Sequence, residues 1–258
     1  MIDQAREFLW LALRPQFLPI LRIFAARKLW GGDSGLDNTR EASLSWCQEH
    51  LTDTRSALAR FAGDPPDTSI RMRFPSLFAL ADQAAQTCPV TMGGPGDLDL
   101  LFGCAEALGA TRAVETGVAY GWSSLALLLS LSTRKGSELV STDLPYPGRG
   151  NEPYVGCVVP QHLREGWTLM RQADRDALPL AIAQLGTIDL CHYDSDKSYH
   201  GRMWAYPRLW DALRPGGIFI SDDIGDNVAF RDFARIINLK PLVVECDGKY
   251  VGILAKPQ

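Results

Sequence analysis

The sequence has few of the residues that build disulfide frameworks or zinc sites. Its six cysteines are widely spread without a CxxC pair, and its four histidines form no HxxxH pattern. Neither spacing is typical of a zinc site. Most of the cysteines lie in apolar surroundings, where a free thiol behaves as a small hydrophobic group. We therefore expect reduced thiols and a cytoplasmic location.

The sequence also lacks an excess of positive charge. It has 26 Lys and Arg against 30 Asp and Glu, a formal net charge of −4. Proteins that bind nucleic acid usually carry a basic patch that neutralises phosphates. We therefore expect no nucleic-acid partner, whereas the charge leaves small-molecule substrates open.

The first 30 residues are apolar but contain no run long enough to span a membrane. Charged residues and prolines interrupt each apolar stretch: Asp3, Arg6, Arg14, Pro15, Pro19 and Arg22. This pattern predicts neither a signal peptide nor a transmembrane helix. It leaves open a peripheral helix pair on a membrane surface. We favour packing of this segment on the core or on a second copy of the chain, as a lid or a homo-oligomer contact.

Two regions differ in their residue patterns. Residues 1–85 have helical spacing interrupted by Gly and Pro and no clear strand, which predicts a helical N-terminal extension. In residues 86–258, β-rich runs alternate with helical ones, which predicts βαβ units and a mostly parallel sheet in one domain. The β-rich runs are TRAVETG, SELVSTD, GWTLMRQ, TIDLCHYD and GGIFISDD. The helices are expected near 97–109, 122–133, 158–165, 177–185 and 199–213.

The C-terminal end of the chain predicts an antiparallel hairpin. The segments KPLVVECDG and KYVGILAKP are separated only by a short Asp-Gly turn, so they can pair only in opposite directions. The predicted fold is thus a doubly wound α/β sheet of seven strands, mostly parallel, with a C-terminal antiparallel hairpin and a helical N-terminal extension.

Polar residues gather where the predicted strands end. In open α/β sheets, ligands bind beyond the carboxyl ends of the strands. The residues at these ends are Glu115, Gly117, Asp143, Asp174, Arg175, Asp176, Asp194, Asp196, Lys197, Asp222 and Asp223. We expect them to form one site.

The segment ETGVAYGWSS, residues 115–124, joins the first of these strands to a helix. Gly117 and Gly121 would let the backbone and the helix N-terminus approach a ligand, although a tight turn alone could also require them. Their spacing departs from GxGxxG and Tyr120 is bulky, which argues against a dinucleotide pyrophosphate. Asp143, at the end of the next strand, can accept hydrogen bonds from ribose hydroxyls. The pattern therefore suits an adenosine ligand without a pyrophosphate.

The chain resembles class I S-adenosylmethionine-dependent methyltransferases, which have a Rossmann-like sheet, over roughly residues 90–258. The resemblance lies in VETGVAYGWSS, STDLPY and LWDALRPGGIFISDD. It implies that Glu115, Gly117 and Ser123 line the methionine end of the cofactor site and that Asp143 holds the ribose. It also implies that the ADRDALP turn, with Asp174, Arg175 and Asp176, flanks the adenine.

Within that group the chain is most similar to cation-dependent O-methyltransferases, of both the catechol or caffeoyl-coenzyme A type and the macrolide or aminocoumarin sugar type. TMGGPGDLDLL resembles their segment before the first strand, and YDSDKSY resembles their DxDK or DxxK turn. The resemblance places Asp194, Asp222 and Asp223 at the metal-ligand positions. It implies methyl transfer to a hydroxyl group of a sugar or a phenol.

Electrostatics points to the same metal hypothesis. Asp194 and Asp196 are two residues apart and can share one face of a strand, next to Asp222 and Asp223. Carboxylates this close require either raised pKa values or a bound cation. Oxygen ligands without Cys or His favour Mg²⁺. Helix capping by one of these aspartates is the structural alternative.

Two residues are candidates for the general base. Lys197 matches the lysine of the catechol type, where a partly desolvated amine can lose its proton, and Asp196 matches the aspartate of the sugar type. Two other functions stay open at this point. One is a methyltransferase that works without a metal, and the other is a cofactor-binding protein without catalysis.

Overall fold

The computed structural model of the protein describes residues 9, 12–14, 39–62, 68–146 and 150–258. Most of the apolar N-terminal segment lies outside these residues, so its predicted role as a lid, membrane contact or homo-oligomer contact is not addressed. None of the helices in the described part of the chain combines the length and apolar character that crossing a bilayer requires.

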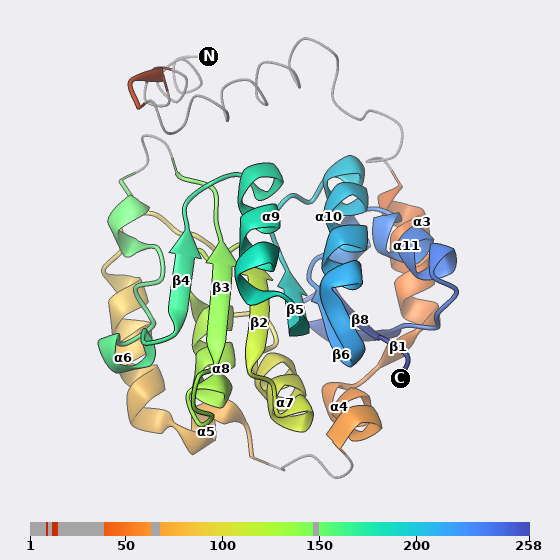
Figure 1. Cartoon of the computed structure of the whole chain (residues 1–258), viewed down its shortest axis with the longest axis horizontal. Coiled ribbons are helices and arrows are strands. Elements are labelled where there is room, and N and C mark those ends of the chain that lie inside the picture. Colours follow the sequence, from red (N-terminus) through yellow and green to blue (C-terminus); the bar gives the residue numbers. More distant parts are fainter. Residues whose placement is uncertain (1–8, 10–11, 15–38, 63–67, 147–149) are drawn as a thin grey trace.

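The centre of the molecule is one eight-stranded sheet in the order β1-β7-β8-β6-β5-β2-β3-β4 (Figure 1). Only the pairs β6/β8 and β7/β8 are antiparallel; the other neighbours are parallel. The strands are β1 Leu51–Thr52, β2 Arg112–Thr116, β3 Glu138–Thr142, β4 Trp167–Met170, β5 Ile188–Tyr193, β6 Leu213–Ser221, β7 Leu242–Cys246 and β8 Lys249–Ala255. The predicted doubly wound α/β fold is confirmed.

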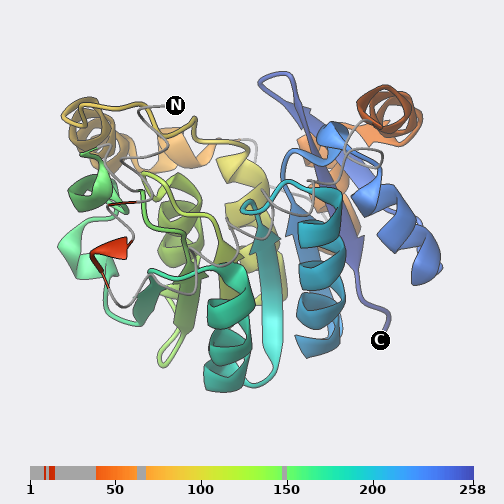
Figure 2. The same cartoon turned by 90° about the horizontal axis from the view of Figure 1, so that it is seen from above.

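Helices cover both faces of this sheet (Figures 1 and 2). The described helices are α3 Arg40–Glu49, α4 Thr54–Ala62, α5 Ile70–Arg73, α6 Pro75–Gln86, α7 Leu98–Leu108, α8 Trp122–Leu131, α9 Asp174–Leu185, α10 Tyr199–Ala212 and α11 Ala229–Ile236. Successive strand residues face opposite layers. Ala113 of β2 packs in the core with α7 and α8, whereas Val114 packs in the core with α9 and α10. Strands buried on both faces explain the nearly continuous apolar runs in the sequence.

Local signals in the sequence set several element boundaries. Asp97 caps α7 by accepting a hydrogen bond from Leu100 N at 2.9 Å, and Ser198 caps α10 through Gly201 N at 3.0 Å. Gly109 ends α7 in the left-handed conformation. Asp247 and Gly248 both have positive φ, as a two-residue type I′ hairpin turn requires. The predicted antiparallel hairpin is therefore confirmed.

Three expectations were wrong in detail: the number of strands, the absence of a strand before residue 86, and the helix near 158–165. The sheet has eight strands instead of seven, because the two-residue β1 pairs with β7 inside the region expected to contain no strand. Two residues are too few to show the alternation of apolar and polar side chains that predicts a strand. The helix expected near 158–165 is only a 3-10 turn at Gln161–Leu163. Pro160 lacks an N–H and disfavours helical geometry in the residue before it, which explains the break.

The described helices before residue 86 pack against the sheet domain. Ala57, Ile70 and Phe78 are buried in the same core cluster as residues of α7 and α8, and Phe78 stacks on Trp122 with ring centroids 6.3 Å apart. The described residues between 40 and 86 thus share a hydrophobic core with the strands that follow. The domain boundary near residue 85 stays a prediction.

Gly117 allows the turn after β2 to pass directly beside the end of β5. Its φ is +79°, and a Cβ at this position would lie 2.2 Å from the carbonyl oxygen of Asp194. No side chain fits in that space. The glycine is therefore required by the packing of two strand ends, which are the ends that carry the predicted site.

We expect Gly117→Ala to lower the free energy of unfolding by about 2–5 kcal/mol, because a left-handed conformation and a backbone clash both oppose the methyl group. Gly136→Ala is the matched control. Gly136 has a φ of +76° but no atom within 4 Å of the added Cβ, so only the conformational cost of about 1–2 kcal/mol applies. Urea denaturation of both variants measures the difference. Equal losses would show that the contact with Asp194 does not constrain this turn.

Candidate functional site

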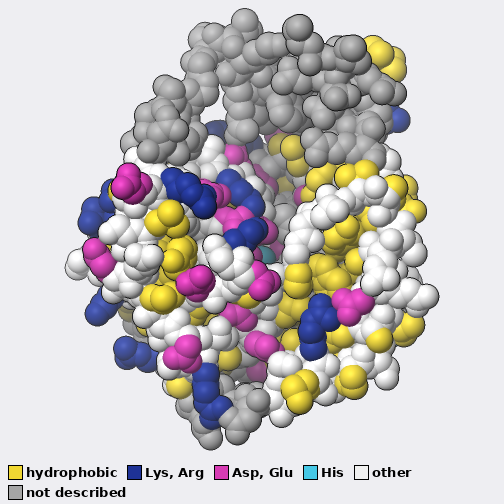
Figure 3. All heavy atoms as spheres, turned by 180° about the vertical axis from the view of Figure 1, so that it is seen from behind, with side chains coloured by type: hydrophobic (Ala, Val, Ile, Leu, Met, Phe, Trp, Pro, Cys, Tyr) yellow, Lys and Arg dark blue, Asp and Glu magenta, His cyan; other side chains and the backbone are white. Residues whose placement is uncertain are grey.

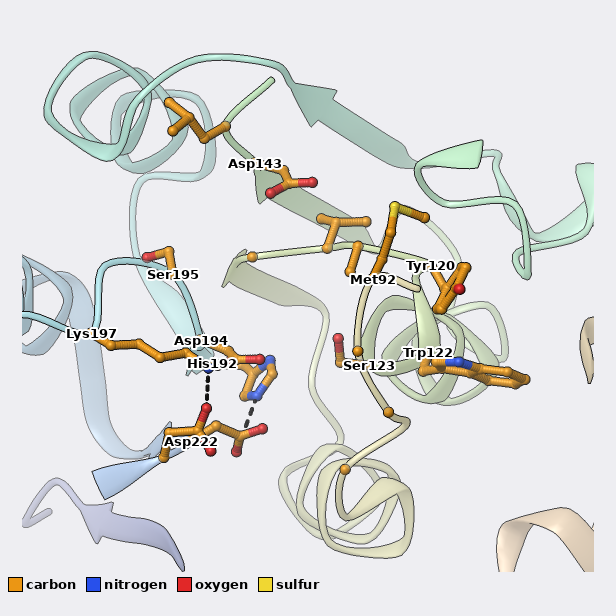
Figure 4. Close-up of a pocket in the computed structure, with 18 of the residues that line it drawn as sticks. Met92, Tyr120, Trp122, Ser123, Asp143, His192, Asp194, Ser195, Lys197 and Asp222 are labelled. Carbon is orange, nitrogen blue, oxygen red and sulfur yellow. Dashed lines mark hydrogen bonds and ion pairs between the residues drawn. The ribbon is translucent and has the colours of Figure 1, made fainter. Parts of the chain in front are cut away.

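A cavity of about 720 Å³ lies at the carboxyl ends of the strands. The turn after β2, the ends of β3, β5 and β6, the start of α9 and the β7–β8 hairpin all contribute lining residues. Figure 4 shows Asp143, Tyr120 and Trp122 around one part of the cavity and Lys197, Asp194, His192 and Asp222 gathered at another. Its size suits a small-molecule ligand, and its position is the one expected for this fold.

The turn after β2 forms one wall of the cavity. Gly117, Tyr120 and Ser123 line it, and the Tyr120 hydroxyl donates a hydrogen bond to Val90 O at 3.3 Å. Gly121 does not line the cavity. Its φ is +91° and an added Cβ would lie 2.9 Å from Gly156 Cα, so packing explains this glycine. Of the two glycines, only Gly117 lines the cavity, and its contact with a ligand stays a prediction.

Glu115 lies below this wall and is fully buried. Its Oε2 accepts hydrogen bonds from the hydroxyls of Ser124, at 2.5 Å, and Ser141, at 2.7 Å. The carboxylate therefore ties β2 to β3 and α8, and it does not line the cavity. Its predicted contact with the cofactor stays a prediction.

Asp143 follows β3 and lines the cavity. Its Oδ2 forms an ion pair with Arg171 Nη1 at 2.7 Å, and Arg171 also binds Glu152 through Nε and Nη2 at 3.0 and 2.7 Å. Burial raises the pKa of Asp143 to about 6, although Arg171 and the N–H groups of Ala119 and Val118 act in the opposite direction. The ion pair with Arg171 thus holds the Asp143 carboxylate in place, where it can accept hydrogen bonds.

The start of α9 was expected to flank an adenine ring. Asp174 and Arg175 line the cavity, whereas Asp176 is exposed and lies outside it. Asp174 accepts a hydrogen bond from Ser195 Oγ at 2.5 Å and another from Thr142 Oγ1 at 3.2 Å. Burial raises its pKa. Asp174 therefore joins β3, β5 and α9, and only part of the predicted turn faces the cavity.

The aspartates predicted to bind a metal meet at another part of the cavity. Asp194 follows β5, and Asp222 and Asp223 follow the neighbouring β6. Two unit charges 4 Å apart interact by about 4 kcal/mol at an effective dielectric constant of 20. Burial and the charge of Asp222 raise the pKa of Asp194 to about 6. The sequence therefore predicted this cluster of carboxylates correctly.

Two lysines neutralise part of this negative charge. The Lys197 ammonium forms an ion pair with Asp223 and lies 3.5 Å from Asp194 Oδ1, and Lys249 Nζ lies 3.1 Å from Asp223 Oδ1. Burial alone would raise the pKa of Asp223, but the two lysines hold it below the ordinary value. Burial alone would lower the pKa of Lys197, but Asp194 and Asp223 raise it. Lys197 is therefore held as an ammonium, and the neutral amine expected of a general base is disfavoured.

His192 is the last but one residue of β5 and lies beside this cluster, with 1% of its side chain exposed. Its Nε2 lies 3.5 Å from Asp222 Oδ1 and its Nδ1 lies 3.7 Å from Glu115 Oε1. Burial alone would lower its pKa, but the two carboxylates raise it to about 10. His192 is thus an imidazolium between two acidic side chains.

Asp196 lines the cavity, but its carboxylate also serves the start of α10. Asp196 Oδ1 accepts a hydrogen bond from Ser198 N at 3.1 Å. A Cβ added to Gly201 would lie 2.3 Å from Asp196 Cγ, so the carboxylate packs against the first turn of this helix. Its predicted role as a general base stays a prediction.

The predicted metal centre does not fit the observed arrangement. Among the residues that the structure describes, no group of three or more His, Cys, Asp or Glu side chains is placed to hold a metal ion. Asp223 faces two lysine ammonium groups and Asp222 faces His192. These contacts place cationic groups beside Asp222 and Asp223, whereas Asp194 Oδ1 accepts no hydrogen bond from the described residues.

Several lining residues were absent from the sequence-based site. They are Met92, Gly93, Gly94, Pro95, Gly96, Trp122, Tyr146, Cys246, Asp247, Lys249 and Val251. The first five belong to the segment TMGGPGDLDLL, for which the sequence indicated only a resemblance to other O-methyltransferases. The recognised Asp-Gly turn could have indicated Lys249, because a hairpin beside β6 brings its turn to the same edge as the end of that strand.

Figure 3 shows acidic and basic side chains side by side near the middle of one face of the molecule, with apolar side chains on one flank. The cavity cluster likewise contains both signs of charge. Three aspartates meet Lys197, Lys249 and His192 there. A polar group with both signs of charge suits a ligand that carries hydroxyl groups better than a strongly anionic ligand.

Comparisons with known proteins agree with this fold. The sequence model of a family described as a methyltransferase domain matches residues 114–224, which confirms the predicted resemblance at this level. A search of curated proteins gave no significant match. An O-methyltransferase from Bacillus cereus, solved with S-adenosylhomocysteine, is 16% identical, with a TM-score of 0.55 over 81% of this chain and 100% of that one.

A second solved structure has a fold that matches this chain equally well. TomG from Streptomyces achromogenes, an O-methyltransferase of tomaymycin synthesis solved with S-adenosylmethionine, is 17% identical. The match covers 70% of this chain and 89% of that one, with a TM-score of 0.54. At these identities the two likenesses show a shared fold, and the family model matches residues 114–224 of this chain.

The charged state of His192 generates a prediction about stability. Because its pKa is raised from 6.5 to about 10 in the folded protein, its stabilising contribution is complete below pH 6.5 and is lost as the pH rises through 10. We expect the free energy of unfolding to fall between pH 7 and 10 more steeply in the wild type than in His192→Gln. His162→Gln, at an exposed position, should keep the wild-type slope.

Nitrogen-15 NMR of the imidazole rings gives the direct check. We expect the His192 ring to remain protonated at pH 8. A His192 ring that loses its proton at or below pH 6.5, or equal slopes for the wild type and His192→Gln, would contradict the assigned charge.

Proposed function

We propose that this methyltransferase domain transfers a methyl group from S-adenosylmethionine to a hydroxyl group of a small molecule. One observation carries the proposal. A single cavity brings the glycine turn after β2 and Asp143 together with a cluster of carboxylates and lysines at the ends of β5 and β6. The first group suits an adenosine-containing cofactor, and the second suits a hydroxyl that must lose its proton.

The cofactor half is assigned to the turn after β2, Asp143 and the start of α9. Gly117 leaves its backbone open to the cavity, and Asp143 would accept hydrogen bonds from the ribose hydroxyls. Asp174 and Arg175 would lie toward the adenine. When bound, S-adenosylmethionine supplies an electrophilic methyl group on a sulfonium.

The reacting half is assigned to Asp194 and Lys197. Asp194 Oδ1 is buried and accepts no hydrogen bond from the described residues, so it can accept one from the acceptor hydroxyl. With a pKa of about 6 it is mostly ionised at pH 7 and can take the hydroxyl proton. The acceptor oxygen then bonds to the methyl carbon as the carbon–sulfur bond breaks. Lys197, held as an ammonium, would stabilise the negative charge on that oxygen.

The predicted general bases thus receive different roles. Lys197 becomes an electrostatic group, because its ion pairs with Asp194 and Asp223 favour the protonated form. Asp196 is the second candidate base, since it lines the cavity two residues from Asp194. A sugar or a phenol fits the proposal equally well. The cytoplasmic location and a homo-oligomer remain predictions.

The divalent cation predicted from the sequence is left out of this proposal. Its three expected ligands face lysines and a histidine in the described structure. The mechanism therefore uses only the side chains of the chain and the bound reactants. A cofactor-binding protein without catalysis is the alternative, which turnover assays distinguish.

Asp143→Asn should weaken S-adenosylmethionine binding by about 10–100-fold, because hydrogen bonds to a charged acceptor contribute about 1.5–3 kcal/mol. Isothermal titration calorimetry measures this effect. Asp176→Asn is the matched control, since Asp176 is exposed on the same helix turn and lies outside the cavity. Unchanged affinity in Asp143→Asn would remove Asp143 from the ribose site.

Asp194→Asn should lower kcat by about 10²–10⁴-fold, the usual contribution of a general base. The affinity for S-adenosylmethionine should change much less. Turnover is measured as S-adenosylhomocysteine release with a panel of sugars and phenols. For the wild type, kcat/KM should rise with pH through about 6, as Asp194 becomes ionised. A flat profile between pH 5 and 7, together with an active Asp194→Asn variant, would rule out this assignment.

A further inference from the structure

The two lysines at the carboxylate cluster come from separate elements. Lys197 lies in the turn between β5 and α10, and Lys249 is the first residue of β8. Both ammonium groups contact Asp223: Lys197 directly, and Lys249 at 3.1 Å from Oδ1 and 3.4 Å from Oδ2. Lys197 also lies 3.5 Å from Asp194 Oδ1 and thereby bridges the two strand ends.

The surrounding structure holds Asp223 in this orientation. Asp223 has a φ of +52°, and 7% of its side chain is exposed. Arg202 of α10 donates a hydrogen bond to Asp223 O at 2.8 Å, and Asn227 donates one to Lys197 O at 2.8 Å. Backbone contacts from two elements therefore position both partners of the ion pair.

The pairing of the strands fixes the position of Lys249. It pairs with Cys246 in the β7–β8 register, directly after the Asp247–Gly248 turn. The antiparallel pairing of β8 with β6 brings this turn beside the end of β6. The hairpin therefore places the ammonium group of Lys249 beside the strand end that carries Asp222 and Asp223.

Cationic side chains of the chain itself face these carboxylates. Lys197 faces Asp194 and Asp223, Lys249 faces Asp223, and the His192 ring lies between Asp222 and Glu115. A divalent cation would add two positive charges to this set and would have to displace ammonium groups from Asp223. Close carboxylates require a compensating cation, and here side chains provide it.

We infer that the ammonium groups of Lys197 and Lys249 take the place of a divalent cation at this site, so that methyl transfer is independent of metal. The inference rests on the proposed function. Lys197 donates a hydrogen bond to the acceptor oxygen, and Lys249 acts as a positioning residue that keeps Asp223 neutralised. Loss of both lysines leaves Asp194 and Asp223 without these partners, next to Asp222, and creates a site for a hard cation.

The first experiment measures metal dependence of the wild-type protein. We expect S-adenosylmethionine to bind in calorimetry. Turnover with the sugars and phenols of the panel should change less than about twofold in EDTA or with added Mg²⁺ or Mn²⁺. Activity that disappears in EDTA and returns with either cation would overturn the inference while leaving the methyltransferase function intact. Absence of both cofactor binding and turnover would instead overturn the proposed function on which the inference depends.

The second experiment measures Mn²⁺ binding by electron paramagnetic resonance, without reference to activity. Lys197→Met combined with Lys249→Met should bind one Mn²⁺ at least about tenfold more tightly than the wild type. Lys240→Met, at an exposed position outside the cavity, should bind like the wild type. The single variant Lys249→Met serves if the double variant does not fold, with thermal unfolding and cofactor titration as the folding checks.

Two results would contradict the inference. One is a wild-type protein that already binds a single Mn²⁺ with a micromolar Kd that requires Asp194. The other is a folded lysine variant whose Mn²⁺ affinity equals that of the wild type and of Lys240→Met. Either result would show that the lysines do not occupy the position of a cation.

Discussion

The crowding of carboxylates at the ends of β5 and β6 is the constraint on which the rest of the site depends. Parallel neighbouring strands bring Asp194, Asp222 and Asp223 to one edge of the sheet, where burial strengthens their repulsion. The fold relieves it with Lys197 from the next turn and Lys249 from the C-terminal hairpin. One arrangement therefore explains the raised pKa values of Asp194 and Lys197 and the lowered pKa of Asp223.

The two halves of the cavity are coupled by close packing of the strands. Gly117 permits the turn after β2 to touch the backbone of Asp194, so the turn proposed to bind the cofactor and the proposed general base share one contact. Below them, His192 lies between Glu115 of β2 and Asp222 after β6. Pre-positioned groups of this kind are what methyl transfer requires, since orientation of the two reactants accounts for much of the rate.

The sequence predicted the parts of the structure that have local signals. Alternating strand and helix patterns, the Asp-Gly turn and polar strand ends identified the fold and the cluster around Asp194. It did not predict contacts between distant residues, such as Arg171 with Asp143 or Lys249 with Asp223, because nothing in the local pattern specifies them. For the same reason it did not predict that Lys197 and Lys249 pair with Asp223 at the proposed metal site.

The central claim is that side-chain cations, and not a divalent metal, balance the carboxylates during catalysis. A crystal structure of the wild-type protein soaked with S-adenosylhomocysteine and Mn²⁺ tests it most directly, because manganese is located by anomalous scattering. The account predicts no anomalous peak at Asp194, Asp222 and Asp223, with Lys197 and Lys249 still paired to Asp223. A manganese peak coordinated by these aspartates, with the lysines displaced, would contradict it.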